Sequence, residues 1–160
     1  AGHDPDRLSE MTSAALAYPM PSTISIASDI LGAITAESDS ILTFPRGLLG
    51  FPECRSFVLL PSERPHVYWL QSADYSSLAF LLVDPFMFFE GYTLDLDATE
   101  TRAASPDEVS VLAIVTLPGA PGELPTANLQ GPVVIHTRLG EGSQVVLAES
   151  SYGIRESFRL

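Results

Sequence analysis

The chain has 160 residues, of which 46% are hydrophobic and 18% charged, a balance that indicates one globular domain and excludes a disordered chain. Its 20 acidic residues are opposed by 8 arginines and no lysine, and the formal net charge of −12 disfavours direct nucleic-acid binding, which needs clustered basic side chains. No apolar run approaches the ~20 residues of a membrane span, and the single cysteine, Cys54, excludes an internal disulfide framework.

The negative charge has two interpretations. The favoured one is that it keeps the protein soluble. The other is a basic protein partner, because an acidic surface accelerates the encounter with one. A lone cysteine fits a reducing compartment under either interpretation.

Residues 1–20 show neither strand alternation nor a full helical stripe, and they lack the basic start and apolar core of a signal peptide. We expect a loose leader here, part of it left over from cloning. A single β domain is expected to follow over residues 21–160.

From Thr23 onward the chain divides into short segments rich in β-branched and aromatic residues, separated by Pro, Gly, Ser and Asp. This spacing predicts an all-β sandwich or barrel with one or two short helical turns. The turns are expected at residues 72–77 and, with Ser105 as N-cap and Pro106 in the first helical position, at residues 105–108. Strands are expected at residues 23–26, 41–44, 57–60, 67–70, 78–83, 92–96, 109–117, 132–137 and 144–148.

Four large apolar residues, Phe86 to Phe89, directly follow the turn signal Asp84–Pro85. A strand over this run would leave some of the side chains facing outward, so the run is the strongest apolar contact candidate, with Glu90 and Tyr92 at its margin. If the run is an interface, Phe88→Ser or Phe89→Ser should weaken binding and leave the melting temperature nearly unchanged. If both residues are core, each substitution should cost roughly 3–5 kcal/mol.

Asp95 and Asp97 lie two residues apart, on one face of a predicted strand. An acid–base pair would require burial that raises the pKa of one carboxyl. The favoured interpretation is instead the solvated side of an edge strand, which would offer a partner an acidic edge.

The stretch from Pro125 to Leu147 contains the only asparagine of the chain, Asn128, and is expected to form a β-hairpin. Its strands are predicted at residues 133–138 and 144–149, joined by the glycine-containing loop 139–143.

No catalytic or metal-binding set is apparent in the sequence. The three histidines, His3, His66 and His136, have no second ligand at metal-site spacing, and His136 is expected to face solvent or the rim of its strand. Cys54 has no partner histidine in a recognisable signature and is expected to be an ordinary thiol. The sequence therefore predicts neither an enzyme nor a cofactor or metal site.

Five blocks in order give the chain a family resemblance: F-P-R-G-L-L-G-F-P-E from Phe44, W-L-Q-S from Trp69, L-A-F-L-L-V-D-P from Leu78, T-A-N-L-Q-G-P-V-V-I from Thr126 and Q-V-V-L from Gln144. With them, the chain resembles the FliW family of bacterial flagellar assembly factors over about residues 21–158. The resemblance implies a compact antiparallel β-barrel-like single domain without catalysis.

The resemblance also implies partners. FliW proteins bind flagellin in the cytoplasm and, when flagellin is depleted, bind CsrA, a small basic RNA-binding protein that represses flagellin translation. No contact with nucleic acid or membrane is implied, and we expect a monomer in the free state. The alternatives are a small-ligand-binding β-barrel and a module that self-assembles through Phe86 to Phe89.

The resemblance also implies roles for residues that lie in the matching motifs. Gln71, Asp84 and Asn128 are polar residues beside apolar strands, where each either caps a turn or faces a partner; the turn role is favoured for Asp84 and Asn128. The residues expected in the core are Trp69, Phe80, Leu82, Val111, Ile114, Val133, Ile135, Val145 and Leu147.

Overall fold

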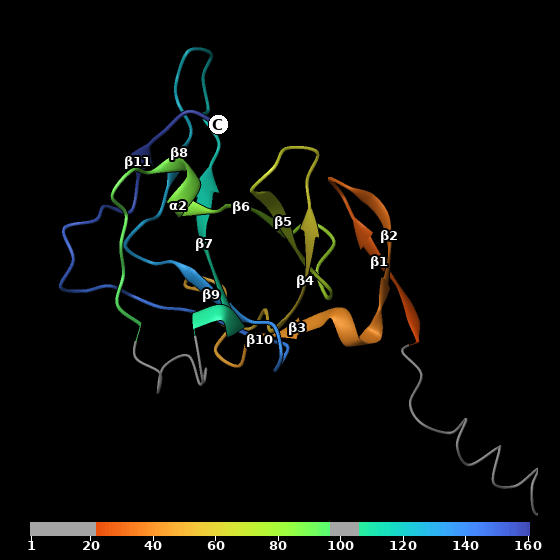
Figure 1. Ribbon diagram of the computed structural model, residues 1–160. Helices are drawn as coiled ribbons and strands as arrows, with labels where there is room; N and C mark the ends of the chain where they lie inside the picture. Colours follow the sequence, from red (N-terminus) through yellow and green to blue (C-terminus); the bar gives the residue numbers. More distant parts are fainter. Residues whose placement is uncertain (1–21, 97–105) are drawn as a thin grey trace, which may run out of the picture.

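The computed structural model describes residues 22–96 and 106–160 (Figure 1). Short strands dominate the described chain, together with one α-helical turn and two 3₁₀ turns. The elements are β1 (Thr23–Ser28), β2 (Gly32–Glu37), η1 (Ser38–Ser40), β3 (Ile41–Thr43), β4 (Ser56–Pro61), β5 (Val67–Ser72), β6 (Ala79–Val83), α2 (Pro85–Phe88), η2 (Pro106–Glu108), β7 (Val109–Thr116), β8 (Thr126–Ala127), β9 (Val133–His136), β10 (Glu141–Gln144) and β11 (Glu156–Ser157).

Seven of the described strands close into a barrel in the order β3-β4-β5-β6-β7-β9-β10. Neighbouring strands are antiparallel except β3 and β10, which run parallel and share a single residue pair, Thr43 with Glu141. β8 pairs with the end of β7 that lies beyond its pairing with β9, and β11 pairs with β8. The predicted all-β, barrel-like fold is confirmed.

Side chains fill the interior of the barrel. Phe44, Phe57, Leu70 and Leu82 are fully buried there, and the rings of Phe44 and Phe57 meet edge to face with centroids 5.1 Å apart. Alternation along each strand points these residues inward, and burial of their apolar surface stabilises the closed sheet.

Two further apolar clusters pack outside the barrel. One joins β5, β6 and β7 to Phe158 beside β11 and to the half-buried rings of Phe88 and Phe89. The other lies under the β1–β2 hairpin, which Figure 1 shows beside β4, and it contains Ile26, Ile34 and Val58. Both clusters attach peripheral elements to the barrel wall.

The predicted core is correct for Leu82, Val133 and Ile135, which are buried. Trp69, Phe80 and Ile114 are half-buried. Phe80 and Ile114 pack against the cluster inside the barrel, and Trp69 packs against the outer cluster that contains Phe158. Val111, Val145 and Leu147 are also only half-buried.

Several local predictions need correction. Residues 85–88 form α2, so the run from Phe86 does not form a strand, and residues 92–96 are irregular, so Asp95 does not lie on an edge strand. Ser72 ends β5, and residues 73–77 turn without forming a helix. The turn at 106–108 is confirmed as η2, while Ser105 lies outside the described residues.

The hairpin between β9 and β10 is confirmed, with a different register. Its second strand begins at Glu141, which pairs with His136, and the turn occupies residues 137–140, with Gly140 at a φ of 64°. In the described part of the chain, no helix is both long and apolar enough to cross a membrane.

Candidate functional site

The aromatic run begins with a capped helical turn. Oδ1 of Asp84 accepts a hydrogen bond from the Phe86 N–H at 3.0 Å, and Pro85 occupies the first helical position. A carboxylate cap followed by proline is a strong helix start, because it satisfies a free N–H and fixes φ. The turn role predicted for Asp84 is therefore correct.

The α2 turn divides the aromatic run between surface and interior. Phe86 and Met87 are 49% and 58% exposed, and Glu90 beyond them is exposed as well. Phe88 and Phe89 are half-buried against the Phe158 ring, with centroid distances of 5.6 and 5.2 Å. The exposed apolar surface of α2 is thus the pair Phe86 and Met87.

Tyr92 is a buried residue and not part of the exposed margin. Only 4% of it is exposed, and its hydroxyl donates to the Leu129 carbonyl at 2.9 Å. Burial raises the pKa of Tyr92 to about 12, so the hydroxyl remains a donor at neutral pH. Asp95 is exposed, whereas Asp97 lies outside the described residues.

Gln71 organises the loop between β5 and β6. Its side chain is fully buried, and Nε2 donates to the carbonyl oxygens of Ser72 and Leu78 at 3.1 and 3.2 Å. A buried amide that satisfies loop carbonyls stabilises the turn. Of the two roles left open for Gln71, the geometry supports the turn.

Asn128 fixes the turn before β9. Its Oδ1 accepts from the Gly131 N–H at 2.9 Å, and its own N–H donates to the Ile114 carbonyl at the same distance. The side chain replaces a backbone acceptor in a tight turn, as the sequence indicates.

Asn128→Ala is expected to lower the free energy of unfolding by about 1 kcal/mol, because the Gly131 N–H loses its acceptor. Urea unfolding followed by the fluorescence of Trp69 would measure the loss. Asn128→Asp keeps an acceptor oxygen and should cost less. Equal costs for the two variants would show that this hydrogen bond does not stabilise the turn.

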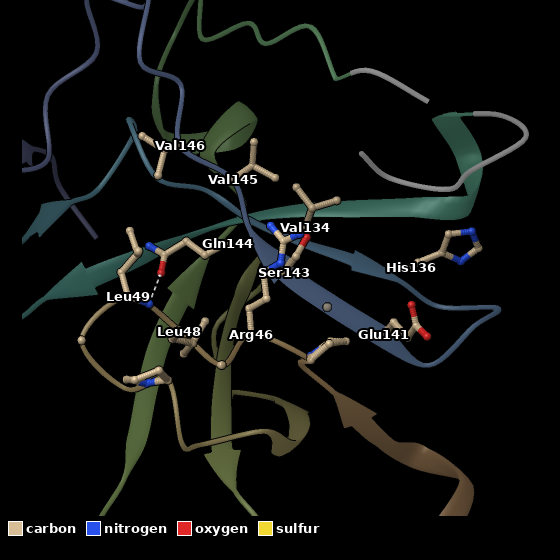
Figure 2. Close-up of a pocket in the computed structure, with 15 residues that line it drawn as sticks. Arg46, Leu48, Leu49, Val134, His136, Glu141, Ser143, Gln144, Val145 and Val146 are labelled. Carbon is tan, nitrogen blue, oxygen red and sulfur yellow. Dashed lines mark hydrogen bonds between the residues drawn. The ribbon is translucent and has the colours of Figure 1, made fainter. Parts of the chain in front are cut away.

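A groove of about 880 Å³ opens between the loop after β3 and the strand β10 (Figure 2). One wall consists of residues 45–50 and 52, the other of residues 141–146, with Val134 and His136 of β9 beside them. The walls come from segments about 95 residues apart in the chain, and no local sequence pattern predicts their meeting.

Two glycines let the walls of the groove form. Gly47 has a φ of 64°, and a Cβ there would lie 2.4 Å from the Phe51 carbonyl oxygen. A Cβ on Gly142 would lie 2.3 Å from the ring of Phe44. Only glycine fits either position, one because of a left-handed turn and a close backbone approach, the other because an aromatic ring fills the space.

Gln144 ties the two walls together. Its Oε1 accepts from the Leu49 N–H and its Nε2 donates to the Gly131 carbonyl, both at 2.9 Å. Figure 2 shows the first of these bonds as a dashed line. In the sequence Q-V-V-L and G-L-L-G-F are separate motifs, and neither predicts the contact between them.

His136 is buried, although its position on the strand predicted exposure. It is 4% exposed, its Nδ1 accepts from the Leu139 N–H at 3.3 Å, and its Nε2 lies 3.5 Å from Oε2 of Glu108. The prediction failed because Glu108 comes from a distant segment, where β7 begins and pairs with β9.

Cys54 is buried, and burial raises the pKa of its thiol, with Glu53 and Asp74 adding to the effect. The thiol form is therefore favoured, which disfavours a nucleophilic role. Within residues 22–96 and 106–160, no group of three His, Cys, Asp or Glu side chains lies close enough to hold a metal ion.

The sequence profile of a family described as "FliW protein" matches residues 25–158. The chain therefore belongs to the FliW family. One curated relative, the flagellar assembly factor FliW of Natranaerobius thermophilus, is 37% identical over 131 residues, which cover 79% of this chain and 87% of the relative. Another, the flagellar assembly factor FliW of Bacillus licheniformis, is 39% identical over 125 residues, or 76% of this chain and 87% of that one.

The crystal structure of a flagellar assembly factor FliW has the same fold, with a TM-score of 0.77 and 33% sequence identity. The match covers 84% of this chain and 96% of the crystallised one. The FliW relatives are named as assembly factors and not as enzymes, which agrees with the absence of a catalytic signature in the sequence.

Proposed function

We propose that this protein is a cytoplasmic flagellar assembly factor that binds flagellin and, when flagellin is depleted, binds CsrA and relieves its repression of flagellin synthesis. The role is one of binding without catalysis. Membership in the FliW family supports it, because the relatives carry the name of flagellar assembly factors.

The observation that carries the proposal is the exposed apolar pair Phe86 and Met87. Flagellin ends in amphipathic helices, whose apolar faces need an apolar surface outside the filament. Asp84 caps the α2 turn, and Phe88 and Phe89 pack against the apolar cluster beneath it. These contacts hold Phe86 and Met87 in place at the surface. Preorganised apolar side chains contribute binding energy at low entropic cost. We therefore place the flagellin contact on α2, with Phe88 and Phe89 as the base that supports it.

The charge of the chain supports the second partner. A net charge of −12 suits a basic protein, and the exposed carboxylates of Glu90 and Asp95 follow α2 along the chain. Asp97 extends this acidic series in the sequence. We place the CsrA contact along it, since complementary charge raises the association rate of two proteins.

The same charge disfavours direct contact with RNA or an anionic membrane, and we propose that the free protein is a monomer. The two alternatives would use different surfaces. Since aromatic and aliphatic side chains fill the barrel interior, a small ligand would have to bind in the groove beside β10. Self-assembly would use Phe86 and Met87.

Size-exclusion chromatography with light scattering tests the proposal, with flagellin and CsrA from the same organism. We expect a stoichiometric complex with each partner, and release of CsrA when flagellin is added to the CsrA complex. Absence of a complex with either partner would refute the proposal. Self-association of the chain alone at high concentration would favour the self-assembly alternative.

A further inference from the structure

The barrel has an open seam between β3 and β10. The two strands share only the pair of Thr43 with Glu141. Beyond Thr43, the Phe44 N–H donates to the Arg55 carbonyl at 2.7 Å on the β4 side, and Pro45 has no N–H to offer to β10. Among the described residues, β10 therefore continues past this pair without a main-chain partner on the seam side.

The end of β10 and the three residues after it carry backbone groups on the seam side that a partner could use. The N–H groups of Val145 and Leu147 donate at 2.9 and 2.7 Å to the segment that leads into β9. Because successive residues of a strand direct their backbone groups to opposite sides, the N–H and C=O groups of Gln144 and Val146 face the seam. An edge of this kind is a template for strand addition.

A side chain holds the neighbouring loop away from this edge. The Leu49 N–H reaches the Gln144 side-chain oxygen and not its main chain. The length of a glutamine side chain therefore separates the two backbones, and the groove lies between them. Leu49 and Val146, 61% and 53% exposed, provide apolar surface on either side.

Arg46 gives the groove a positive charge. Its side chain is exposed, makes no ion pair with the described part of the chain, and in Figure 2 extends across the groove towards Ser143. Glu141, at the base of the groove, already has an interaction within the protein. A ligand with a single carboxylate among uncharged residues would complement Arg46. A ligand with several acidic residues would be repelled, because the chain as a whole is strongly negative.

We propose that the groove binds an extended segment of a partner protein, which adds as a strand to the Gln144–Val146 edge and places one carboxylate beside Arg46. Apolar side chains next to that carboxylate pack on Leu49 and Val146. The site is separate from the α2 surface, and the proposal does not depend on flagellin or CsrA being the partner.

Fluorescence anisotropy with the full chain tests the proposal. The probe is a labelled octapeptide of alternating threonine and valine with one central glutamate, and the matched probe carries lysine instead. We expect the glutamate peptide to bind with a Kd below about 1 mM and the lysine peptide about tenfold more weakly. Methylation of the peptide amides that face β10 should abolish binding, because it removes the strand hydrogen bonds.

Arg46→Glu should reverse the preference between the two peptides, with an unchanged melting temperature because Arg46 is exposed. Amide exchange of Gln144 and Val146 should slow when the glutamate peptide is bound. No saturable binding, or equal binding of the methylated peptide, would overturn the proposal. A concentration-dependent dimer that Val146→Pro abolishes would assign the edge to a second copy of the chain and would overturn it as well.

Discussion

Gly142→Ala is expected to lower the free energy of unfolding by about 1–3 kcal/mol, towards the upper end of that range, because the added methyl group meets the fully buried ring of Phe44. A Cβ at this position would lie 2.3 Å from the ring. The ring cannot move freely, since it packs edge to face on Phe57. Urea unfolding at constant pH measures the cost.

A double-mutant cycle separates this clash from other effects. Phe44→Ala alone should cost about 3–5 kcal/mol as a large-to-small change in the core. In that background, Gly142→Ala should cost much less, because the space is then empty. Gly119→Ala is the matched control, since a Cβ there meets nothing within 4 Å. If Gly142→Ala lowers the free energy of unfolding no more than Gly119→Ala does, that result would contradict the close packing of β10 on Phe44.

Phe88→Ser and Phe89→Ser are each expected to cost about 2–3 kcal/mol, less than a fully buried phenylalanine but well above a surface change. Both rings are half-buried and lie within 5.6 Å of the Phe158 ring, centroid to centroid. The loss of apolar contact should also loosen the C-terminal segment. Urea unfolding with Trp69 as the probe measures both variants, because Trp69 packs against the same cluster.

Met87→Ser is the matched control on the same turn. Met87 is 58% exposed, so its replacement should change the free energy of unfolding by no more than about 0.5 kcal/mol. A neutral Phe88→Ser would contradict the packing of α2 on Phe158. An unfolding cost at Met87 equal to that at Phe88 would contradict the division of α2 into exposed and packed halves.

The sequence predicts strands best where a long run is rich in β-branched residues, because such a run favours a strand over a helix. Residues 109–117 could only be a strand, and β7 spans Val109–Thr116. The run at 86–89 has no predicted element in the sequence, although Asp84–Pro85 carries the same cap-and-proline signature that predicts the turn at 106–108. The cap and the proline are therefore a local signal that is sufficient to predict α2.

The glycines of the β9–β10 hairpin show a second limit of prediction from the sequence. A turn explains Gly140, which has a positive φ, but Gly142 serves a contact with Phe44, almost one hundred residues earlier in the chain. The groove has the same origin, because Leu49 meets Gln144 only after the barrel closes. Composition and residue spacing do not predict such non-local contacts. The aromatic candidate at α2 can be predicted from the sequence because its residues are consecutive, whereas the groove cannot.

Calorimetric titration of flagellin into the chain and into its Phe86→Ser/Met87→Ser variant measures whether the exposed pair on α2 binds flagellin. We expect one-to-one binding by the unmodified chain and binding at least about tenfold weaker by the variant, since exposed apolar anchors dominate such contacts. Thermal unfolding in parallel should give nearly equal melting temperatures. No binding by the unmodified chain, or equal affinity of the two proteins for flagellin, would contradict the account.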